Sequence, residues 1–285
     1  MIYTRIRGGL GNQLFQYCIA RALADRLGVD VGLDIREYNE NSAFEMGLYR
    51  FNLRAKYNPE GLIKHKKDGK LSYVWDIVRG NQKHVYQEPH LGFDSAAISK
   101  PDGTYFKGYW QTEKYFKDCV EKIAKDLEIV DAASDQNIAV LKKIDGCTAV
   151  SLHIRRGDYV SNAGYNAAHG TCDLAYYTRA VAHLVERFGN DIVVFAFSDD
   201  PQWVSENLKL PVDVQYMGHN SSQKNYEDLR LMSRCKHHII ANSSFSWWGA
   251  WLNQDPNKVV IAPQTWFADP KMNNPDILPS DWMTI

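Results

Sequence analysis

The sequence predicts an α/β protein in which two Rossmann-like domains, each with a parallel sheet, face a central cleft. Its 285 residues suffice for two domains with a core each. It opens with a strand, a glycine-rich loop, a helix and a second strand, the pattern of a βαβ unit. Its second half alternates apolar strands with helical stretches through short loops, which requires parallel strands and right-handed crossovers. We place the boundary at residue 146, giving domains 1–146 and 147–285.

The first domain begins with a predicted strand, Ile2–Ile6, that runs into the glycine-rich loop Gly8–Gln13. A helix follows and is predicted to end at Gly28, before a second strand, Val29–Leu33, that leads to Asp34. The helix is indicated by apolar residues at helical spacing, namely Phe15, Ile19, Leu23 and Leu27.

The middle of the chain, Arg36–Asp102, shows no regular pattern. The basic run Lys64–Lys70 within it is typical of a solvated loop or helix face, and contact with a membrane surface is the less favoured interpretation. Tyr105–Gln111 is predicted as a further strand, and Ala133–Lys143 as a helix that leads to the domain boundary.

The second domain is more regular. Its predicted strands are Thr148–Ile154, Ile192–Phe197, Val212–Tyr216, His238–Ala241 and, as the last one, Val259–Ala262. Its predicted helices are one capped by Asp173 and ending at Phe188, a short one that starts at Pro201, Asn225–Cys235, and Ser246–Asn253. Ligands of such sheets bind at the carboxyl ends of the strands, so the residues there are candidates for chemistry.

Polar residues follow three of these strands. Arg155 and Arg156 follow the first, and two adjacent arginines can clamp a phosphate or carboxylate, although surface salt bridges are the alternative. Ser243, Ser244 and Ser246 precede a helix, where hydroxyl and N–H groups can bind a diphosphate or only cap the helix. Asp199-Asp200 could bind a metal, but a helix cap at Asp200 is favoured. The residues alone therefore predict a nucleoside-diphosphate binder.

Composition narrows the class of protein. A net charge of −1 argues against a general nucleic-acid binder. Five separated cysteines without a CxxC pair indicate reduced thiols, and hence a cytoplasmic protein. No signal peptide is evident, and no apolar run approaches the ~20 residues of a membrane span. We expect a cytoplasmic protein, with peripheral contact at the inner membrane as an open alternative.

Five motifs resemble those of glycosyltransferase family 11, the α-1,2-fucosyltransferases, and the bacterial enzymes above all. They are GGLGNQLFQY at 8–17, YFKGYWQ at 105–111, HIRRGDYV at 153–160, FSDD at 197–200 and IIANSSFSWWGAWL at 239–252. The resemblance implies a GT-B-type enzyme that moves L-fucose from GDP-fucose to the 2-hydroxyl of a β-galactoside with inversion. It implies that no metal or other cofactor is needed, that the second domain binds the donor, and that the first shapes the acceptor site.

The resemblance also assigns roles to single residues. Arg155 matches the arginine that grips the diphosphate, with His153 and Arg156 beside it, and Ser243 and Ser244 face the pyrophosphate. We add Ser246, from the same loop, to the predicted donor site. Asp228 resembles the carboxylate that binds guanine, although it could also be an ordinary first-turn helix carboxylate. Gly11 and Asn12 are placed near the reacting sugar.

The general base has no clear match. Asp158 is the first candidate because it is close to the arginine motif, but a role in supporting the arginines is as plausible. Asp34, His169 and Asp173 are the others. A strongly dissociative transition state would need little help from a base, and Asn12 or His153 could then only orient the hydroxyl.

The expected partners are GDP-fucose and a galactose-containing acceptor, carried on a lipid during O-antigen or other surface polysaccharide synthesis. No nucleic-acid partner is expected. Three alternatives remain open: a non-catalytic nucleotide-sugar or glycan-binding protein of the same fold, a transferase of another GDP-sugar or linkage, and an oxidoreductase, which the lack of GxGxxG disfavours.

Overall fold

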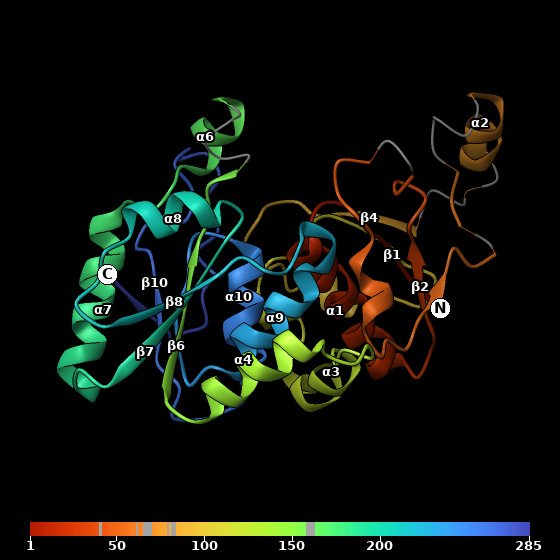
Figure 1. The fold of residues 1–285 in the computed structure, drawn as a ribbon. Coiled ribbons are helices and arrows are strands. Elements are labelled where there is room, and N and C mark those ends of the chain that lie inside the picture. The colour runs from red at the N-terminus through yellow and green to blue at the C-terminus, as the bar shows by residue number, and fades with distance from the viewer. Residues whose placement is uncertain (40–41, 61, 65–69, 79, 81–83, 158–162) are drawn as a thin grey trace. The chain divides into compact units, whose positions relative to one another are not determined.

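The computed structural model describes residues 1–39, 42–60, 62–64, 70–78, 80, 84–157 and 163–285. The chain divides into two compact units, each an α/β unit with a parallel sheet, as predicted (Figure 1). Unit 1 comprises Met1–Glu128 and Asn274–Ile277, and unit 2 comprises Ile129–Asn273 and Leu278–Ile285.

The division between the units falls earlier than the predicted boundary at residue 146. Helix α4, Asp135–Asp145, belongs to unit 2 rather than to the first half of the chain. The reason lies in its apolar face, because Val140 and Ile144 pack in one core cluster with Phe195 and Leu231.

The sheet of unit 1 has five parallel strands in the order β3-β2-β1-β5-β4. They are β1 Ile2–Arg5, β2 Val31–Asp34, β3 Lys56–Tyr57, β4 Val85–Gln87 and β5 Tyr105–Lys107. The α-helices of the unit are α1 Leu10–Leu27, α2 Lys70–Val78 and α3 Val120–Asp126. Short 3-10 turns occupy Gly47–Arg50, Ala97–Ser99, Glu113–Tyr115 and Lys117–Cys119. The irregular middle thus contributes two short strands that the sequence did not indicate.

Helix α1 is the central helix of unit 1. It is buried over most of its length, and it packs against β1 and β2 and ends at Gly28, as predicted. Two glutamines are buried within it, Gln13 and Gln16. Buried amides need hydrogen-bond partners, and these two find them in the loops at the carboxyl edge of the sheet, described below.

The sheet of unit 2 has six parallel strands in the order β11-β10-β9-β6-β7-β8. They are β6 Thr148–Ile154, β7 Ile192–Ser198, β8 Asp213–Met217, β9 His237–Ile239, β10 Val260–Ala262 and β11 Met283–Thr284. Counted from β6, this is the 3-2-1-4-5-6 order of a doubly wound sheet. The prediction that Val259–Ala262 is the last strand is wrong, because β11 pairs with β10 after a long irregular connection.

Helices cover both faces of this sheet (Figure 1). Helices α7 and α8 share one core cluster with the strands, and α4 and α9 share another on the opposite face, where α9 also contacts α10. Their bounds are α6 Ala163–His169, α7 Leu174–Phe188, α8 Pro201–Asn207, α9 Asn225–Arg234 and α10 Ser244–Trp251. Helix α10 starts two residues earlier than predicted. Its Trp247, Trp248 and Trp251 are all buried. No helix in the described parts of the chain is both long and apolar enough to span a membrane.

Candidate functional site

The candidate donor site lies where the strand order of unit 2 reverses, between β6 and β9. Strands β6 and β9 pair in parallel, with Leu152 opposite Ile239, so the loops that follow them leave the sheet side by side. Strand β7 flanks β6 on the other side, with Ile154 opposite Ser198. Three polar loops therefore meet at the carboxyl edge of the sheet, which is the usual ligand site of a doubly wound sheet.

Arg155, the first residue after β6, is held by a carboxylate from the neighbouring loop. Its Nη1 lies 2.7 Å from Oδ2 of Asp199, which follows β7. The other oxygen of Asp199 accepts a hydrogen bond of 2.9 Å from the backbone N–H of Arg156. One carboxylate thus fixes both the Arg155 guanidinium and the backbone beside it. Fixed, partly exposed guanidinium groups are suited to bidentate binding of a phosphate.

The loop and this carboxylate approach so closely that a side chain at residue 157 would not fit. A Cβ added to Gly157 would lie 2.5 Å from Oδ2 of Asp199. Glycine is therefore needed in the HIRRGD motif for close approach rather than for an unusual backbone angle.

Arg156 does not form the predicted phosphate clamp together with Arg155, because its guanidinium has other partners. Its Nε lies 3.3 Å from Oδ2 of Asp200, and its guanidinium carbon lies 3.4 Å from the centre of the Trp203 ring. Asp200 also caps α8 by accepting from the backbone N–H of Trp203, as predicted. No cluster of three or more metal-ligating side chains is found among the residues described. Arg155 and Arg156 thus have different partners, and Arg155 is the better placed of the two for an anion.

His153 lies beneath this loop at the end of β6. Its side chain is buried, and its ring centre lies 5.7 Å from that of Phe245 in the first turn of α10. Burial lowers the pKa of His153 to about 4, although Asp199 opposes the shift. The imidazole is therefore neutral near pH 7. Its Nδ1 is buried and has no hydrogen-bond partner among the described residues.

The serine loop after β9 forms the start of α10. Ser243 caps the helix, because its hydroxyl accepts from the backbone N–H of Phe245 at 3.3 Å. Ser244 is half-buried in the first turn. Ser246 departs from the prediction that it binds the diphosphate: it is fully buried, and its hydroxyl faces the backbone carbonyls of Ala241 and Ser243. The serines that remain candidates for an anion are Ser243 and Ser244.

Asn242, in the same loop, fastens it to two distant segments. Its side-chain amide donates to the carbonyls of His169 at 2.8 Å, Gly170 at 3.3 Å and Trp266 at 3.1 Å. Its oxygen accepts from the thiol of Cys172. The asparagine of the NSS motif therefore positions the loop, and its amide is already saturated with protein contacts.

Asp228 lies in the first turn of α9, which crosses from β8 to β9 and so begins at the same carboxyl edge. Its Oδ1 accepts 2.7 Å from Nδ2 of Asn220, and among the described residues its Oδ2 has no hydrogen-bond partner. Burial raises the pKa of Asp228 to about 7, opposed by the Asn220 hydrogen bond and assisted by Glu227. A partly buried carboxylate with one open oxygen is suited to a pair of N–H donors.

In unit 1, the corresponding reversal of strand order lies between β1 and β5, and the predicted GGLGNQ loop follows β1. Gly8 has a φ of 79°, a conformation that favours glycine. Its carbonyl accepts from Nε2 of Gln13 at 2.9 Å and from the hydroxyl of Tyr38 at 2.7 Å. Oδ1 of Asn12 accepts from Nε2 of Gln111, after β5, at 2.7 Å. Gly11 is buried in the first turn of α1, so Asn12 is the residue of this pair that joins the two loops.

Gln16 and Glu88 complete this edge of unit 1. Gln16 joins the same two loops, because its oxygen accepts from Arg7 N at 2.9 Å and its nitrogen donates to Gly108 O at 3.1 Å. Glu88 accepts from the backbone N–H groups of Tyr109 and Trp110 at 2.7 and 2.8 Å. Trp110 is buried and has a φ of 57°, which is unfavourable for a side chain of that size. The two hydrogen bonds from Glu88 stabilise this strained turn.

Of the four candidate bases, two are engaged in structural contacts. Asp34 is buried and accepts from Arg36 and from the hydroxyl of Tyr105 at 2.5 Å. Asp173 caps α7 through the N–H of Tyr176, as predicted. The ring of His169 lies 5.6 Å from that of Phe267. Asp158 lies outside the described residues. The structure therefore assigns no base. Among the described residues Asp199 supports Arg155, and the roles considered for Asp158 stay predictions.

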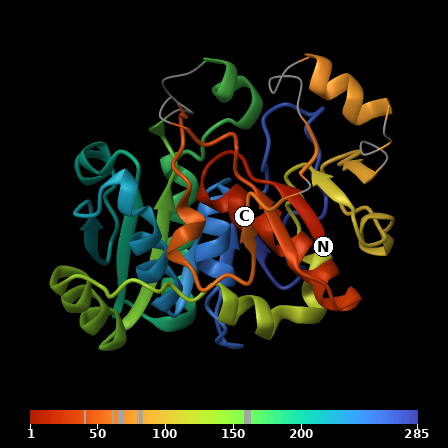
Figure 2. The same cartoon turned by 90° about the vertical axis from the view of Figure 1, so that its right-hand side faces the viewer.

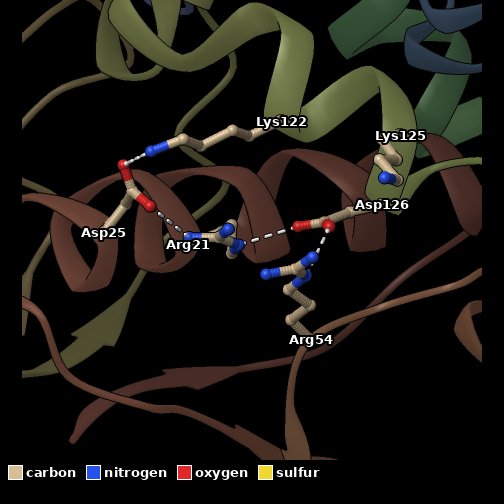
Figure 3. Close-up of a pocket in the computed structure, with 6 residues that line it drawn as sticks. All are labelled: Arg21, Asp25, Arg54, Lys122, Lys125 and Asp126. Carbon is tan, nitrogen blue, oxygen red and sulfur yellow. Dashed lines mark hydrogen bonds and ion pairs between the residues drawn. The ribbon is translucent and has the colours of Figure 1, made fainter.

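Unit 1 also has a charged cavity of about 290 Å³ between α1 and α3. Figure 3 shows Asp126 between Arg21 and Arg54. Asp126 is buried and lies 2.7 Å from Nε of Arg21 and 3.5 Å from Nε of Arg54. The hydroxyl of Tyr17 donates to it at 2.7 Å. This cavity contains none of the predicted site residues, and its ion pairs connect the two helices.

Four contributing residues were not singled out from the sequence in these roles: Asp199, Gln111, Asn220 and Glu88. Asp199 lies within the FSDD motif at 197–200 and Gln111 ends the YFKGYWQ motif at 105–111, so their position after predicted strands was a usable signal. Asn220 and Glu88 lie in loops without a pattern, and their roles follow only from tertiary contacts.

The chain is similar in sequence to known glycosyltransferases. Residues 79–285 match the family model described as glycosyl transferase family 11. The chain is 35% identical to an alpha-1,2-colitosyltransferase of Escherichia coli, covering 100% of this chain and 99% of that protein. It is 27% identical to the O-antigen biosynthesis glycosyltransferase WbnK of the same species, covering 100% of both. The structure of NodZ alpha-1,6-fucosyltransferase soaked with GDP-fucose aligns with a TM-score of 0.49 and 14% identity, over 88% of this chain and 91% of that one. A family model that matches most of the chain, and a relative of this identity over its full length, show that the protein belongs to glycosyl transferase family 11.

Proposed function

We propose that this glycosyltransferase moves L-fucose from GDP-fucose to the 2-hydroxyl of a β-galactoside, forming an α-1,2 linkage with inversion. The observation that carries the proposal is the Arg155 guanidinium held by Asp199 at the strand-order reversal, beside the amino end of α10. A positive group fixed at that place is suited to a diphosphate leaving group.

In this proposal the donor diphosphate lies between Arg155 and the first turn of α10. Negative charge builds on the β-phosphate as the bond to the sugar breaks. The guanidinium, the N–H groups at the helix start and its dipole oppose that charge. The neutral imidazole of His153 contributes a hydrogen bond rather than a positive charge. We therefore expect transfer to proceed without an added divalent cation.

Guanine is assigned to Asp228. Guanine presents two neighbouring donors, N1–H and the 2-amino group, and a carboxylate is their natural complement. The oxygen of Asp228 without a hydrogen-bond partner among the described residues, and the Asn220 contact that fixes the other one, support this assignment. Adenine lacks this pair of donors, so the arrangement favours a GDP-linked donor.

The acceptor is assigned to unit 1, where Asn12 and Gln111 connect the loops at the strand-order reversal. We further propose that the acceptor is a lipid-linked surface polysaccharide, because the O-antigen biosynthesis glycosyltransferase WbnK resembles the whole chain. The names of the two Escherichia coli relatives do not identify the acceptor sugar, so the galactoside is part of the proposal.

A second donor, GDP-colitose, is favoured by the 35% identity to an alpha-1,2-colitosyltransferase. Colitose is the sugar that remains when the 3-hydroxyl of L-fucose is replaced by hydrogen. A site that hydrogen-bonds this hydroxyl would reject colitose strongly, whereas a site that only accommodates it would discriminate little. The ratio of kcat/KM for the two donors therefore distinguishes the candidates.

The test incubates the protein with GDP-fucose or GDP-colitose and a panel of β-galactosides, and measures GDP release and product linkage, with and without EDTA. Fucosyl transfer to the 2-hydroxyl with GDP-fucose as the better donor supports the proposal. Higher kcat/KM with GDP-colitose moves the assignment to the second donor. Binding of GDP without turnover of either donor contradicts both and indicates a non-catalytic protein.

A further inference from the structure

Helix α2 of unit 1 exposes an apolar face that packs on nothing in the described structure. Leu71 is 79% exposed, Val78 is 70% exposed and Trp75 is 60% exposed, and Val74 and Ile77 are exposed as well. Figures 1 and 2 show the helix standing clear of the strands of its own unit. In a parallel α/β unit a crossover helix normally buries such a face against the sheet.

The exposed residues form a stripe. Leu71, Val74, Trp75 and Val78 follow the i, i+3, i+4, i+7 spacing of one helix face. Five of the eleven large apolar side chains that are exposed in the described chain belong to this nine-residue helix. A concentration of this kind marks an interaction surface rather than scattered surface residues.

The charge of the surrounding sequence indicates the partner. Residues 64–84 contain six Lys or Arg and two Asp, a net charge of +4, although the whole chain has a net charge of −1. An apolar helix face that includes a tryptophan, flanked by lysines, is the pattern of helices that lie in the interface of an anionic bilayer. A second copy of this chain would bring two basic segments together, which disfavours self-association through this face.

We propose that α2 is a membrane-docking helix, which inserts the Leu71, Val74, Trp75 and Val78 face into the interface of a bilayer with anionic headgroups. The basic residues that flank the helix in the sequence attract the anionic surface, and the apolar stripe provides the side chains that enter the bilayer. This inference is independent of the donor site, since none of its residues lies in the loops assigned to GDP-fucose.

The test is flotation of the full chain with phosphatidylcholine vesicles and with vesicles in which phosphatidylglycerol supplies anionic headgroups. We expect binding to the anionic vesicles that weakens with salt. The double variant Leu71→Glu, Val78→Glu should bind on the order of 100-fold more weakly, because two apolar side chains no longer enter the bilayer. Val130→Glu is the matched control, because Val130 is an exposed apolar residue of unit 2 at 58% exposure.

Equal flotation of the double variant and the wild type, or no flotation of the wild type at low salt, would overturn the proposal. So would a wild-type dimer by light scattering that the double variant abolishes in the absence of vesicles, since the face would then join two copies. All variants should keep the wild-type thermal melt and the wild-type rate on a water-soluble galactoside, so that loss of vesicle binding is separable from loss of function.

Discussion

Asp199 is the residue on which the candidate donor site depends most. It binds Nη1 of Arg155 with one oxygen and the backbone N–H of Arg156 with the other. A guanidinium on a flexible side chain loses entropy when it binds a phosphate, and a fixed one loses less. We therefore expect Asp199 to act as a positioning residue, and Arg155 to act on the donor directly.

Replacing these two residues should separate the two roles. Arg155→Ala removes the positive charge and should lower kcat about 10²–10³-fold without unfolding the protein. Asp199→Asn leaves the guanidinium but loosens it, and should lower kcat about 10–100-fold. Asp200→Asn is the matched control, because it weakens the cap of α8 and the contact with Arg156 only. Steady-state kinetics and a thermal melt measure all three, and an Arg155→Ala enzyme with near-normal kcat would refute the assignment.

The carboxyl of Asp228 should make the affinity for guanosine depend on pH. Because burial raises the pKa of Asp228 to about 7, the carboxyl is protonated below that pH in the free protein. Only the ionised form accepts from both guanine donors, so affinity for guanosine should fall as the pH is lowered from about 7, up to tenfold per unit. Guanosine is used because it has no phosphate that titrates in this range. Asp228→Asn should bind it weakly and without this pH dependence, which calorimetry can measure, with adenosine as the control ligand.

The Asp228 carboxyl should also make the free energy of unfolding depend on pH, in the opposite direction to the affinity for guanosine. A carboxyl whose pKa is higher in the folded than in the unfolded protein stabilises the fold when protonated, so its contribution is lost as the pH rises from about 4 to about 7. Asp228→Asn should therefore raise the free energy of unfolding at pH 8. A variant that loses both guanosine affinity and stability there would show that Asp228 is only a structural residue.

Residue positions were predictable from sequence where a motif lies at a strand end. The structure places Arg155, Asp200 and Ser243 at the expected edge and confirms the helix cap at Asp200, whereas the donor contacts of Arg155 and Ser243 stay predictions. The burial of Ser246 was not predicted, because the position of a residue in a motif does not reveal which face of the helix is buried. Asn220 and Glu88 were missed because they act through contacts between residues far apart in sequence.

At the scale of elements, the charged cavity of unit 1 joins α1 to α3. Asp126 of α3 is almost fully buried and accepts hydrogen bonds from the Tyr17 hydroxyl and from Nε of Arg21, both in α1. Figure 3 shows the contact with Arg21. Burial, assisted by the nearby Asp126 carboxylate, raises the pKa of Tyr17 above its usual range, so the phenol keeps its proton and donates it in this hydrogen bond. Between α1 and α3, the contacts of Asp126 with Tyr17 and Arg21 are therefore buried polar contacts instead of apolar packing.

Asp126→Ala should destabilise unit 1 by about 3–5 kcal/mol, because it leaves the buried Arg21 guanidinium without this partner. Asp25→Ala is the matched control, since Asp25 pairs with Arg21 and Lys122 at a more exposed position and should cost below about 1 kcal/mol. Urea unfolding of both variants checks the difference. Equal losses in the two would contradict a special role for the buried carboxylate.

Elements were predictable in proportion to their length and apolar content. Strand β6 and helix α7 occur with the predicted bounds, because each has a long apolar pattern and α7 has a cap at both ends. Strands β3 and β11 have two residues each and consist largely of polar or isolated apolar positions, so periodicity could not reveal them. Helix α2 was missed although Leu71, Val74, Trp75 and Val78 have helical spacing, because the helix begins at the last residue of the basic run Lys64–Lys70, in a part of the chain interpreted as irregular.

A segment close to the carboxyl end of the chain, Asn274–Ile277, is part of unit 1. Asn274 donates to the carbonyl of Gln111 at 2.9 Å, and Asp276 accepts from the N–H of Phe93 at 2.8 Å and pairs with Lys114. Gln111 in turn binds Asn12 of the glycine-rich loop. The prediction of a single domain boundary missed this return of the chain to unit 1, because the returning segment, Asn274–Ile277, has only four residues and no sequence pattern.

Removing these contacts should affect one unit and not the other. Asp276→Ala leaves the Phe93 N–H without its acceptor and should cost about 1–2 kcal/mol. Hydrogen exchange followed by mass spectrometry should show lost protection in peptides around Phe93 and Gln111, and unchanged protection in β6 and β7. Equal loss in both units would contradict the division of the chain as described.

The central claim is that Arg155 and the start of α10 bind the diphosphate and that Asp228 binds the guanine. A crystal structure of the protein with GDP tests it most directly. We predict that a β-phosphate oxygen lies within hydrogen-bond distance of the Arg155 guanidinium and of a backbone N–H at Ser243 or Ser244, with guanine N1 and N2 facing Asp228. Density for GDP that contacts neither Arg155 nor Asp228 would contradict the account.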